Sequence, residues 1–495
     1  LARTAKEQKS SFVHALVSSG KLKPADLAHT LSKALSVPVM DLAAVDLQRL
    51  PKGIIDNKLA SQYQVLALSK RGNRLFVAAS DPTNQEAVER IKFATQLTPE
   101  WVIVEQDKLA KLLDGLTASA EEQLSALASS DTKPMGAAMV TQYFPQTGGR
   151  QDIGPLPRWT VLYLVTQDDR ARASMLANAD AAGGVPIHYR DETTDQPLDV
   201  QRYPNVTLGY PDLSNPKVPE GSGSTNWTPD RAHQPSFAYM PYLITGDAYY
   251  LDETLFWASW NVAITDAGNR GGASGLINQE QMRGQAWGMR SLSEAAFIVP
   301  DAHPQRAYYK AMLANNINWY AQRTASTTQM SPLGALGLFD EPAAAIPWQN
   351  DFMGLIFSRL AENNEPKARD VLNVISKFNV GRFVNDANGY CSNKAAVYDM
   401  LIANPSNMQY FTTWSALFAA NFSSQVGKAC STVPMNEEAY TDDPQGMSAF
   451  ARAALAAAAN AGVSNAAAAY TKWKGLTPAL DDEFRYAPQF AIIPT

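Results

Sequence analysis

The stretch YQVLALSKRGNRLFVAASDPTN, residues 63–84, decides the fold of the first part of the chain. Two short apolar runs, 65–68 and 75–78, stand on either side of Arg71-Gly72-Asn73, so the pattern predicts two strands joined by a tight turn. Asp81-Pro82-Thr83-Asn84 then predicts the beginning of a helix. The stretch therefore predicts strand, turn, strand and helix in that order.

The segments on either side of this stretch complete a small domain. Residues 9–34 predict two short helices, the first ending at Gly20 and the second beginning at Pro24. Trp101, Val102 and Val104 predict a last strand. We expect residues 1–125 to form an α/β domain.

This first part resembles the N-terminal domain of the MshE/GspE family, which occurs in type IV pilus assembly and type II secretion ATPases. Three segments carry the resemblance: residues 11–22 with Leu27 and Leu31, residues 37–42, and residues 80–84 with the following 91–95. The resemblance covers about a quarter of the chain. It implies a cytoplasmic module that docks regulators or binds cyclic di-GMP.

The residues at the beginning of the resemblance favour docking over nucleotide binding. The nucleotide-binding form of the family begins with Arg-Leu-Gly, where this chain has Ser11, Phe12 and Val13. The arginine that would meet a phosphate and the glycine that permits close backbone approach are both missing. We therefore expect the domain to bind a pilus-assembly protein.

An ATPase domain is not expected. A P-loop requires Gly-x-x-x-x-Gly-Lys-Ser/Thr, so that backbone amides surround the phosphates. Val426-Gly427-Lys428-Ala429 lacks the upstream glycine, which is Phe422 here, and the hydroxyl residue.

Composition excludes several other classes. The chain has 495 residues, which predicts at least two domains, and a net charge of −6, which gives no basic surface for nucleic acid. No apolar run approaches the roughly 20 residues that span a bilayer. The chain begins at Leu1, which leaves a cleaved signal peptide open. No metal or cofactor is expected, and the two cysteines, Cys391 and Cys430, either form one disulfide or remain free thiols.

The larger part of the chain predicts helical hairpins. Residues 126–155 are rich in small polar residues and predict a linker. Beyond it, apolar helical segments alternate with short polar turns near residues 168, 246, 300, 363, 404 and 461. Six hairpins bury their apolar faces by closing into a ring, so we expect a multidomain chain in which residues 156–495 form a mainly α six-hairpin (α/α) toroid. An open solenoid is the alternative.

The six-hairpin pattern is similar to the helical toroids of glycosidases and polysaccharide lyases. The segments 239–247 and 283–287 add to this likeness, which is architectural and implies a polysaccharide or glycan as ligand. We expect the long connections to gather at one rim and to supply the ligand-binding side chains. The substrate-binding candidates are His188, Asp191, Glu192, Trp227, Glu280, Trp287, Trp348 and Asp351.

Two mechanisms fit these residue types. In a lyase, Asn226, His233 and Arg283 would neutralise a uronate carboxylate, and Tyr242 would be base and acid. His233 and Tyr242 cooperate only if His233 precedes the helix, which Pro235 favours. A glycosidase instead needs two carboxyl groups, one from Asp191 or Glu192 and one from Glu280, Asp351 or Glu437.

Structural roles compete with each of these assignments. Histidines 188 and 233 also suit helix caps, the tryptophans suit the core, and Asp230 and Asp351 suit N-caps.

We interpret the chain as a docking module joined to a glycan-binding or glycan-cleaving toroid. The alternatives are a non-enzymatic interaction protein of a pilus or other surface appendage, or two halves that are not naturally one protein. The halves disagree on compartment, since the first part's relatives are cytoplasmic and the second part suits the periplasm or cell exterior.

Overall fold

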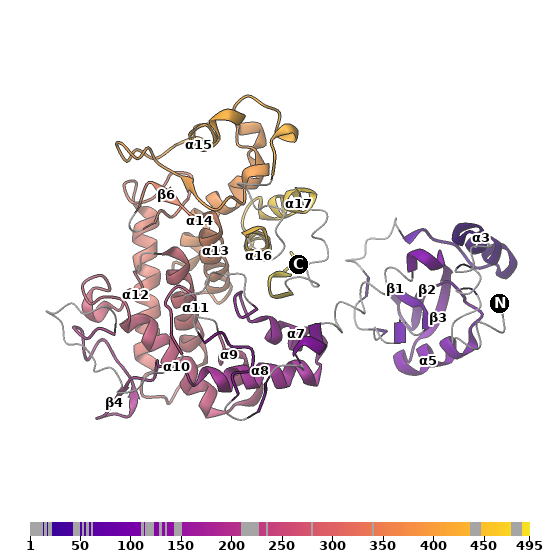
Figure 1. Cartoon of the computed structure of the whole chain (residues 1–495), viewed down its shortest axis with the longest axis horizontal. Helices are drawn as coiled ribbons and strands as arrows, with labels where there is room; N and C mark the ends of the chain where they lie inside the picture. Colours follow the sequence, from indigo (N-terminus) through magenta and orange to yellow (C-terminus); the bar gives the residue numbers. More distant parts are fainter. Residues whose placement is uncertain are drawn as a thin grey trace. The chain divides into compact units, whose positions relative to one another are not determined.

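The computed structural model describes two compact units, Leu1–Gln123 and Leu124–Thr495 (Figure 1). The described residues are 13, 17, 22–42, 50–51, 54–55, 59–60, 63–109, 113, 123–127, 131–133, 136–142, 151–208, 227–233, 236–278, 281–338, 341–435, 447–476 and 488–495.

The N-terminal unit is built on a three-stranded sheet in the order β1-β2-β3. Strands β1 (Val65–Arg71) and β2 (Arg74–Ala79) are antiparallel, and β3 (Thr98–Ile103) runs parallel to β2. The predicted hairpin is confirmed, and Gly72 has a φ of 60° in its turn, a conformation that glycine adopts without steric cost. Two helices are described beside the sheet, α3 (Pro24–Leu35) and α5 (Gln85–Thr95).

Local signals explain where these helices begin. Pro24 occupies the first turn of α3, as its fixed φ favours. Asn84 caps α5, because its side-chain oxygen accepts a hydrogen bond from the Ala87 amide at 3.2 Å. The core between helix and sheet contains Leu75, Val77 and Ile91, all fully buried.

The second unit is largely helical. Its main helices form pairs in which each helix packs against the next one in sequence. The pairs are α7 (Arg158–Thr166) and α8 (Asp169–Ala182), α9 (Tyr239–Thr245) and α10 (Ala248–Ala263), α11 (Met282–Ile298) and α12 (Arg306–Ala325), α13 (Pro347–Glu362) and α14 (Ala368–Val384), α16 (Met447–Asn460) and α17 (Ala466–Leu476). Short pairs of strands, β4 (Arg190–Asp191) with β5 (Gln196–Pro197) and β6 (Ala344–Ala345) with β7 (Met400–Leu401), lie in the connections.

The turns between helices form as their residues predict. Gln167 ends α7 in a left-handed conformation, and Asp168 caps α8 by accepting a hydrogen bond from the Arg170 amide at 2.8 Å. Gly246 and Asp247 repeat this arrangement between α9 and α10. The predicted turns near 168 and 246 are therefore confirmed.

Helices α11 and α13 form the centre of the helical unit. Each packs against the other, α11 also contacts α10 and α12, and α13 contacts α14 and α16. The ring centroids of Trp287 and Phe352 lie 4.3 Å apart, and Phe450 lies 4.5 Å from both Phe352 and Phe490. Aromatic side chains thus fill the space between α11, α13 and α16.

The hairpin predicted around residue 404 is not a pair of helices, and this expectation was wrong. Asn404 lies in a turn closed by a 2.9 Å hydrogen bond to the Gln409 carbonyl, and the segment before it contains 3-10 turns and β7. A single helix, α15 (Trp414–Asn421), follows, and Figure 1 places it at the top of the helical unit. The frequent Asn, Gly and Ser residues between α14 and α15 prevent continuous helices.

A disulfide joins Cys391 to Cys430 across this region, with a Cα–Cα distance of 5.2 Å. It borders a separate hydrophobic cluster that includes Tyr390, Ile402 and Phe418. Of the two sequence alternatives, the bonded state is the one that the structure shows.

Part of the segment predicted as a linker belongs to a core. Leu127 and Val140 are buried in the same cluster as Trp159 of α7. Among the described residues, none of the helices combines the length and apolar character needed to cross a bilayer.

Candidate functional site

Three of the predicted site residues come together around Asp230. Nδ1 of His233 lies 2.8 Å from Oδ1 of Asp230, and the charge of Arg283 acts on the same carboxylate. The Arg283 guanidinium carbon lies 5.5 Å from the ring centroid of Trp348. We call Asp230, His233, Arg283 and Trp348 the Asp230 cluster.

A tight turn positions the first two residues. The Asp230 carboxylate accepts a 2.7 Å hydrogen bond from the Ala232 amide, and the His233 amide donates to the Asp230 carbonyl at 3.3 Å. This turn folds His233 back over Asp230 and leaves its side chain almost fully buried. His233 therefore lies in the connection before α9, as the predicted cooperation with the helix requires.

The first turns of α11 and α13 position the other two. The Arg283 amide donates to Oε1 of Gln349 at 3.1 Å, which ties the beginning of α11 to that of α13. Nε of Arg283 donates to Oε1 of Gln281 at 2.6 Å and fixes the guanidinium over Trp348. Trp348 is itself anchored against Phe352 and Phe450 at 6.0 and 5.6 Å.

The surroundings of Asp230 favour its charged form. Burial alone would raise the pKa of Asp230, but the hydrogen bond from His233 and the charges of His233 and Arg283 outweigh burial and hold the pKa below its usual value. Asp230 is thus favoured in its charged form, and the positive charge of Arg283 makes the smallest of these contributions to lowering its pKa.

A second polar group surrounds Tyr239, at the beginning of α9. Nη2 of Arg359 donates to the Tyr239 hydroxyl at 2.6 Å, and Nη1 of the same arginine lies 3.2 Å from Oε1 of Glu294. The Ser236 hydroxyl donates to the other oxygen of Glu294. Burial raises the pKa of Tyr239, and the nearby Arg359 opposes that shift.

The sequence pointed to Tyr242 as the base and acid of a lyase, and it did not indicate the group formed by Tyr239, Arg359 and Glu294. Tyr242 is half-buried and packs against the hydrophobic clusters on both sides of α9. Arg359 and Glu294 lie inside helices rich in apolar residues, each directly after a serine, Ser358 and Ser293. A charged residue on the core-facing side of a helix was the available signal. The contact of both residues with the α9 region could not be read from their neighbours in sequence.

A small pocket adjoins the Tyr239 group, and its lining includes Ser236, Tyr239, Trp257 and Glu294. It has room for about one water molecule. The pocket is therefore too small for a saccharide.

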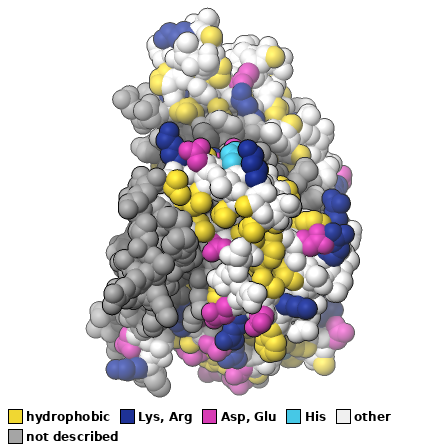
Figure 2. Space-filling model, turned by 90° about the vertical axis from the view of Figure 1, so that its right-hand side faces the viewer, with side chains coloured by type: hydrophobic (Ala, Val, Ile, Leu, Met, Phe, Trp, Pro, Cys, Tyr) yellow, Lys and Arg dark blue, Asp and Glu magenta, His cyan; other side chains and the backbone are white. Residues whose placement is uncertain are grey.

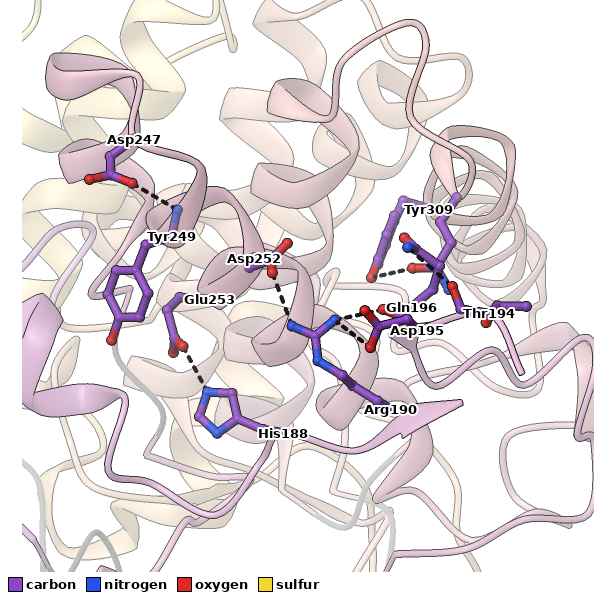
Figure 3. Close-up of polar contacts among 11 residues, drawn as sticks. His188, Arg190, Thr194, Asp195, Gln196, Asp247, Tyr249, Asp252, Glu253 and Tyr309 are labelled. Carbon is purple, nitrogen blue, oxygen red and sulfur yellow. Dashed lines mark hydrogen bonds and ion pairs between the residues drawn. The ribbon is translucent and has the colours of Figure 1, made fainter. Parts of the chain in front are cut away.

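The predicted residue His188 lies in another polar cluster, at α10. Nε2 of His188 lies 2.8 Å from Oε1 of Glu253, and Figure 3 shows the imidazole directed toward that carboxylate. Arg190 donates to Oδ2 of Asp252 at 3.0 Å and to the Asp195 carbonyl at 2.6 Å (Figure 3). These contacts fasten the β4–β5 hairpin to α10.

Neighbouring candidates serve the same hairpin or the core. The Asp191 carboxylate accepts hydrogen bonds from Thr193 at 2.7 Å and from the Tyr203 hydroxyl at 3.0 Å, and the contact with Thr193 contributes most to lowering its pKa. Glu192 is exposed in the hairpin turn. Trp227 is half-buried and packs against the cluster around α8.

Trp287 and Asp351 lie in the interior of the helical unit. Trp287 packs between Phe352 and Arg290, whose guanidinium carbon lies 4.2 Å from the indole centroid. Asp351 forms a buried ion pair with Arg382, in which burial raises the pKa of Asp351 and Arg382 opposes the shift. Asn226, Glu280 and Glu437 lie outside the described residues.

On the face in Figure 2, basic and acidic side chains are interspersed, with hydrophobic side chains in the middle of the view. Within the described ranges, no group of three or more His, Cys, Asp or Glu side chains is placed to hold a metal ion.

Comparison with known proteins identifies relatives of the N-terminal unit. Residues 35–123 match the MshEN domain family. The type IV pilus assembly ATPase PilB of Pseudomonas aeruginosa is 37% identical over 127 residues, which are 26% of this chain and 22% of that protein. PilB of Acinetobacter baylyi is 38% identical over 109 residues, 22% of this chain and 19% of that protein.

A solved structure of the N-terminal domain of XpsE is 20% identical, covers 23% of this chain and 80% of that chain, and has a TM-score of 0.20. The chain spans about a fifth of the length of the two PilB proteins. The N-terminal domain is thus related to the MshEN domain of type IV pilus assembly ATPases.

Proposed function

We propose that the N-terminal domain docks the chain onto a component of a type IV pilus. Its kinship with the PilB N-terminal domain supports this role. So does its surface, where Phe93 on α5 is 77% exposed and Leu35 on α3 and Met40 are partly exposed. Exposed apolar side chains of this size cost about 25 cal/mol per Å² in water, and a partner would remove that cost.

The helical unit, in this proposal, is a ring of helix pairs. Its support is a circuit of neighbours that runs from α7 through α8, α9, α10, α11, α13 and α16 to η9 (Pro488–Phe490) and back to α7. Nη1 of Arg452 donates to the Phe490 carbonyl at 3.1 Å, and Nε2 of Gln489 donates to the Ile153 carbonyl at 3.4 Å. The last turn thus joins α16 to the segment before α7.

The function of this ring, we propose, is to bind a glycan at the Asp230 cluster. The observation that carries the proposal is the meeting of Asp230, from the connection before α9, with Arg283 and Trp348, from the first turns of α11 and α13. The Arg283 guanidinium and the exposed side-chain amide of Gln281 offer directional hydrogen bonds beside the largely buried indole of Trp348, and sugar hydroxyls require such hydrogen bonds.

The charge environment of Arg283 and the raised pKa of Tyr239 favour glycan binding over cleavage of a uronate polymer. A lyase site must neutralise a carboxylate, but Arg283 already faces the ionised Asp230. Burial raises the pKa of Tyr239, so at neutral pH this residue stays protonated and has no free electron pair of a phenolate with which to accept a proton, despite its contact with Arg359.

The contact between Arg359 and Tyr239 keeps a lyase as the second candidate. An arginine that donates to a phenol oxygen stabilises the phenolate, the form that would remove the proton next to a uronate carboxylate. A lyase would produce unsaturated products that absorb in the ultraviolet. A glycan-binding protein would retain the same polymers without that absorbance.

The disulfide supports an oxidising compartment for the helical unit. Since both units belong to one chain, we propose that the docking partner is a pilus component in that compartment. Fluorescently labelled full chain, applied to immobilised neutral and acidic glycans, tests the binding function. Retention on none of them would refute it.

A further inference from the structure

An exposed tyrosine extends the Asp230 cluster. Tyr398 is 49% exposed, and its ring centroid lies 6.4 Å from that of Trp348, with 54° between the ring planes. Trp348 itself is only 7% exposed. Tyr398 therefore provides the accessible aromatic surface beside a tryptophan that is fixed in the core.

A strand pair on one side of Tyr398 and a disulfide on the other restrain the backbone that carries this residue. Strand β7, which begins two residues later, pairs with β6, and the Ile402 amide donates to the Ala343 carbonyl at 2.7 Å. Seven residues earlier, Cys391 is bonded to Cys430. A ring that is presented on a restrained backbone loses less conformational entropy when a ligand covers it.

The side chains next to Tyr398 define the class of ligand. The Arg283 guanidinium lies over Trp348 and adds planar hydrogen-bond donors, and Gln281 adds an exposed amide. A pyranose ring has an apolar face of C–H groups and a rim of hydroxyls, which match an aromatic face and such donors and acceptors.

The charges select between neutral and acidic sugars. Asp230 compensates the charge of Arg283, and Asp399, next to Tyr398, is an exposed acid. A polyuronate would bring its carboxylates to a surface without net positive charge and would have to be desolvated there. A neutral glycan meets no such penalty.

We propose that Tyr398 and Arg283 form the two sides of a subsite for a neutral pyranose ring, with the sugar stacked on the exposed face of Tyr398. This subsite rests on the proposed glycan-binding function. It includes Tyr398, which no sequence pattern indicated, and its ligand would be a neutral sugar.

Titration of the full chain with neutral cello-, malto- and chitin-oligosaccharides, followed by calorimetry, tests the subsite. Tyr398→Ala should weaken binding about tenfold or more, because it removes the stacking surface, whereas Tyr398→Phe should stay within about threefold of the unchanged protein. Phe297→Ala is the matched control. It removes another exposed aromatic side chain, 57% exposed and about 21 Å along α11 from Arg283 at 1.5 Å per residue, and should leave binding unchanged.

The outcomes separate this inference from the function on which it rests. If the unchanged chain binds a neutral oligosaccharide and Tyr398→Ala binds it equally well, the subsite is wrong and the glycan-binding function stands. If the chain prefers alginate or polygalacturonate oligosaccharides, the charge argument is wrong. If it binds no saccharide of either kind, both proposals are refuted. Because Tyr398 is half exposed, its alanine variant should unfold at the same temperature as the unchanged protein.

Discussion

The imidazole Nδ1 of His233 lies 2.8 Å from Oδ1 of Asp230, and the carboxylate in this pair also faces the charge of Arg283. One ionised aspartate thus orients a buried histidine and compensates an arginine that covers Trp348. Asp230, together with the exposed Asp399, therefore contributes negative charge to the site.

Asp230→Asn should change which glycans bind. The substitution removes the negative charge and leaves that of Arg283 uncompensated. We expect affinity for acidic oligosaccharides to rise, and the gain to shrink as salt is added, because exposed charges are screened over about 10 Å at 0.1 M ionic strength. Calorimetry at low and high salt measures both effects. An unchanged preference would show that Asp230 does not set the charge of the site.

The low pKa of Asp230 predicts a pH-dependent contribution to stability. A carboxylate whose pKa is depressed by folding stabilises the protein above its unfolded value, about 3.9, and loses that contribution as pH falls through the folded value. The difference in melting temperature between the unchanged protein and Asp230→Asn should therefore be constant near neutrality and shrink in acid. A difference that grows in acid would contradict the assignment.

Asp351→Ala should destabilise the helical unit by about 3–5 kcal/mol, because it leaves Arg382 buried without its partner carboxylate. Urea unfolding measures the change. Replacing both residues with apolar ones, Asp351→Leu with Arg382→Met, should recover much of the loss. If Asp351 instead contacted substrate, the single variant would lose glycan binding and keep its stability.

The cysteines should give no reaction in a thiol titration of the denatured, unreduced protein. The bond closes a loop with a sequence separation of 39, so replacing both cysteines with serine should cost about 3–4 kcal/mol of unfolding free energy. Two reactive thiols in protein purified from its native compartment would remove the argument for export.

Phe93→Ala should weaken docking of the N-terminal domain while leaving its fold intact, since 77% of this residue is exposed. The measurement is the affinity of surface-immobilised full chain for separately purified pilus components of one bacterium. Phe297→Ala, in the helical unit, is the control. Docking that survives Phe93→Ala would place the binding surface elsewhere.

The N-terminal fold was predictable because its signals are local. Short apolar runs stand on either side of the turn at Gly72, and the Asn84 cap lies directly before α5, so strand, turn and helix are each specified by a few neighbouring residues. The turns at Asp168 and Asp247 were predictable for the same reason, because an aspartate cap needs no distant partner.

The site was only partly predictable. His233, Arg283 and Trp348 were found because each lies at or near the end of a long connection. Arg359, Glu294 and Tyr398 were missed, because their importance depends on tertiary contacts between helices and strands distant in sequence. The pair of helices predicted around Asn404 was wrong for the same reason. A disulfide and a separate hydrophobic cluster stabilise that region in place of helix packing, and both depend on residues distant in sequence.

Glycan binding at the Asp230 cluster is tested most directly by the affinity of the full chain and of its Arg283→Ala variant for a neutral oligosaccharide, measured side by side by calorimetry. We predict saturable binding by the unchanged chain and at least a tenfold loss of affinity in the variant, a change of about 1.4 kcal/mol. Equal affinities, or heat of binding from neither protein, would contradict this prediction.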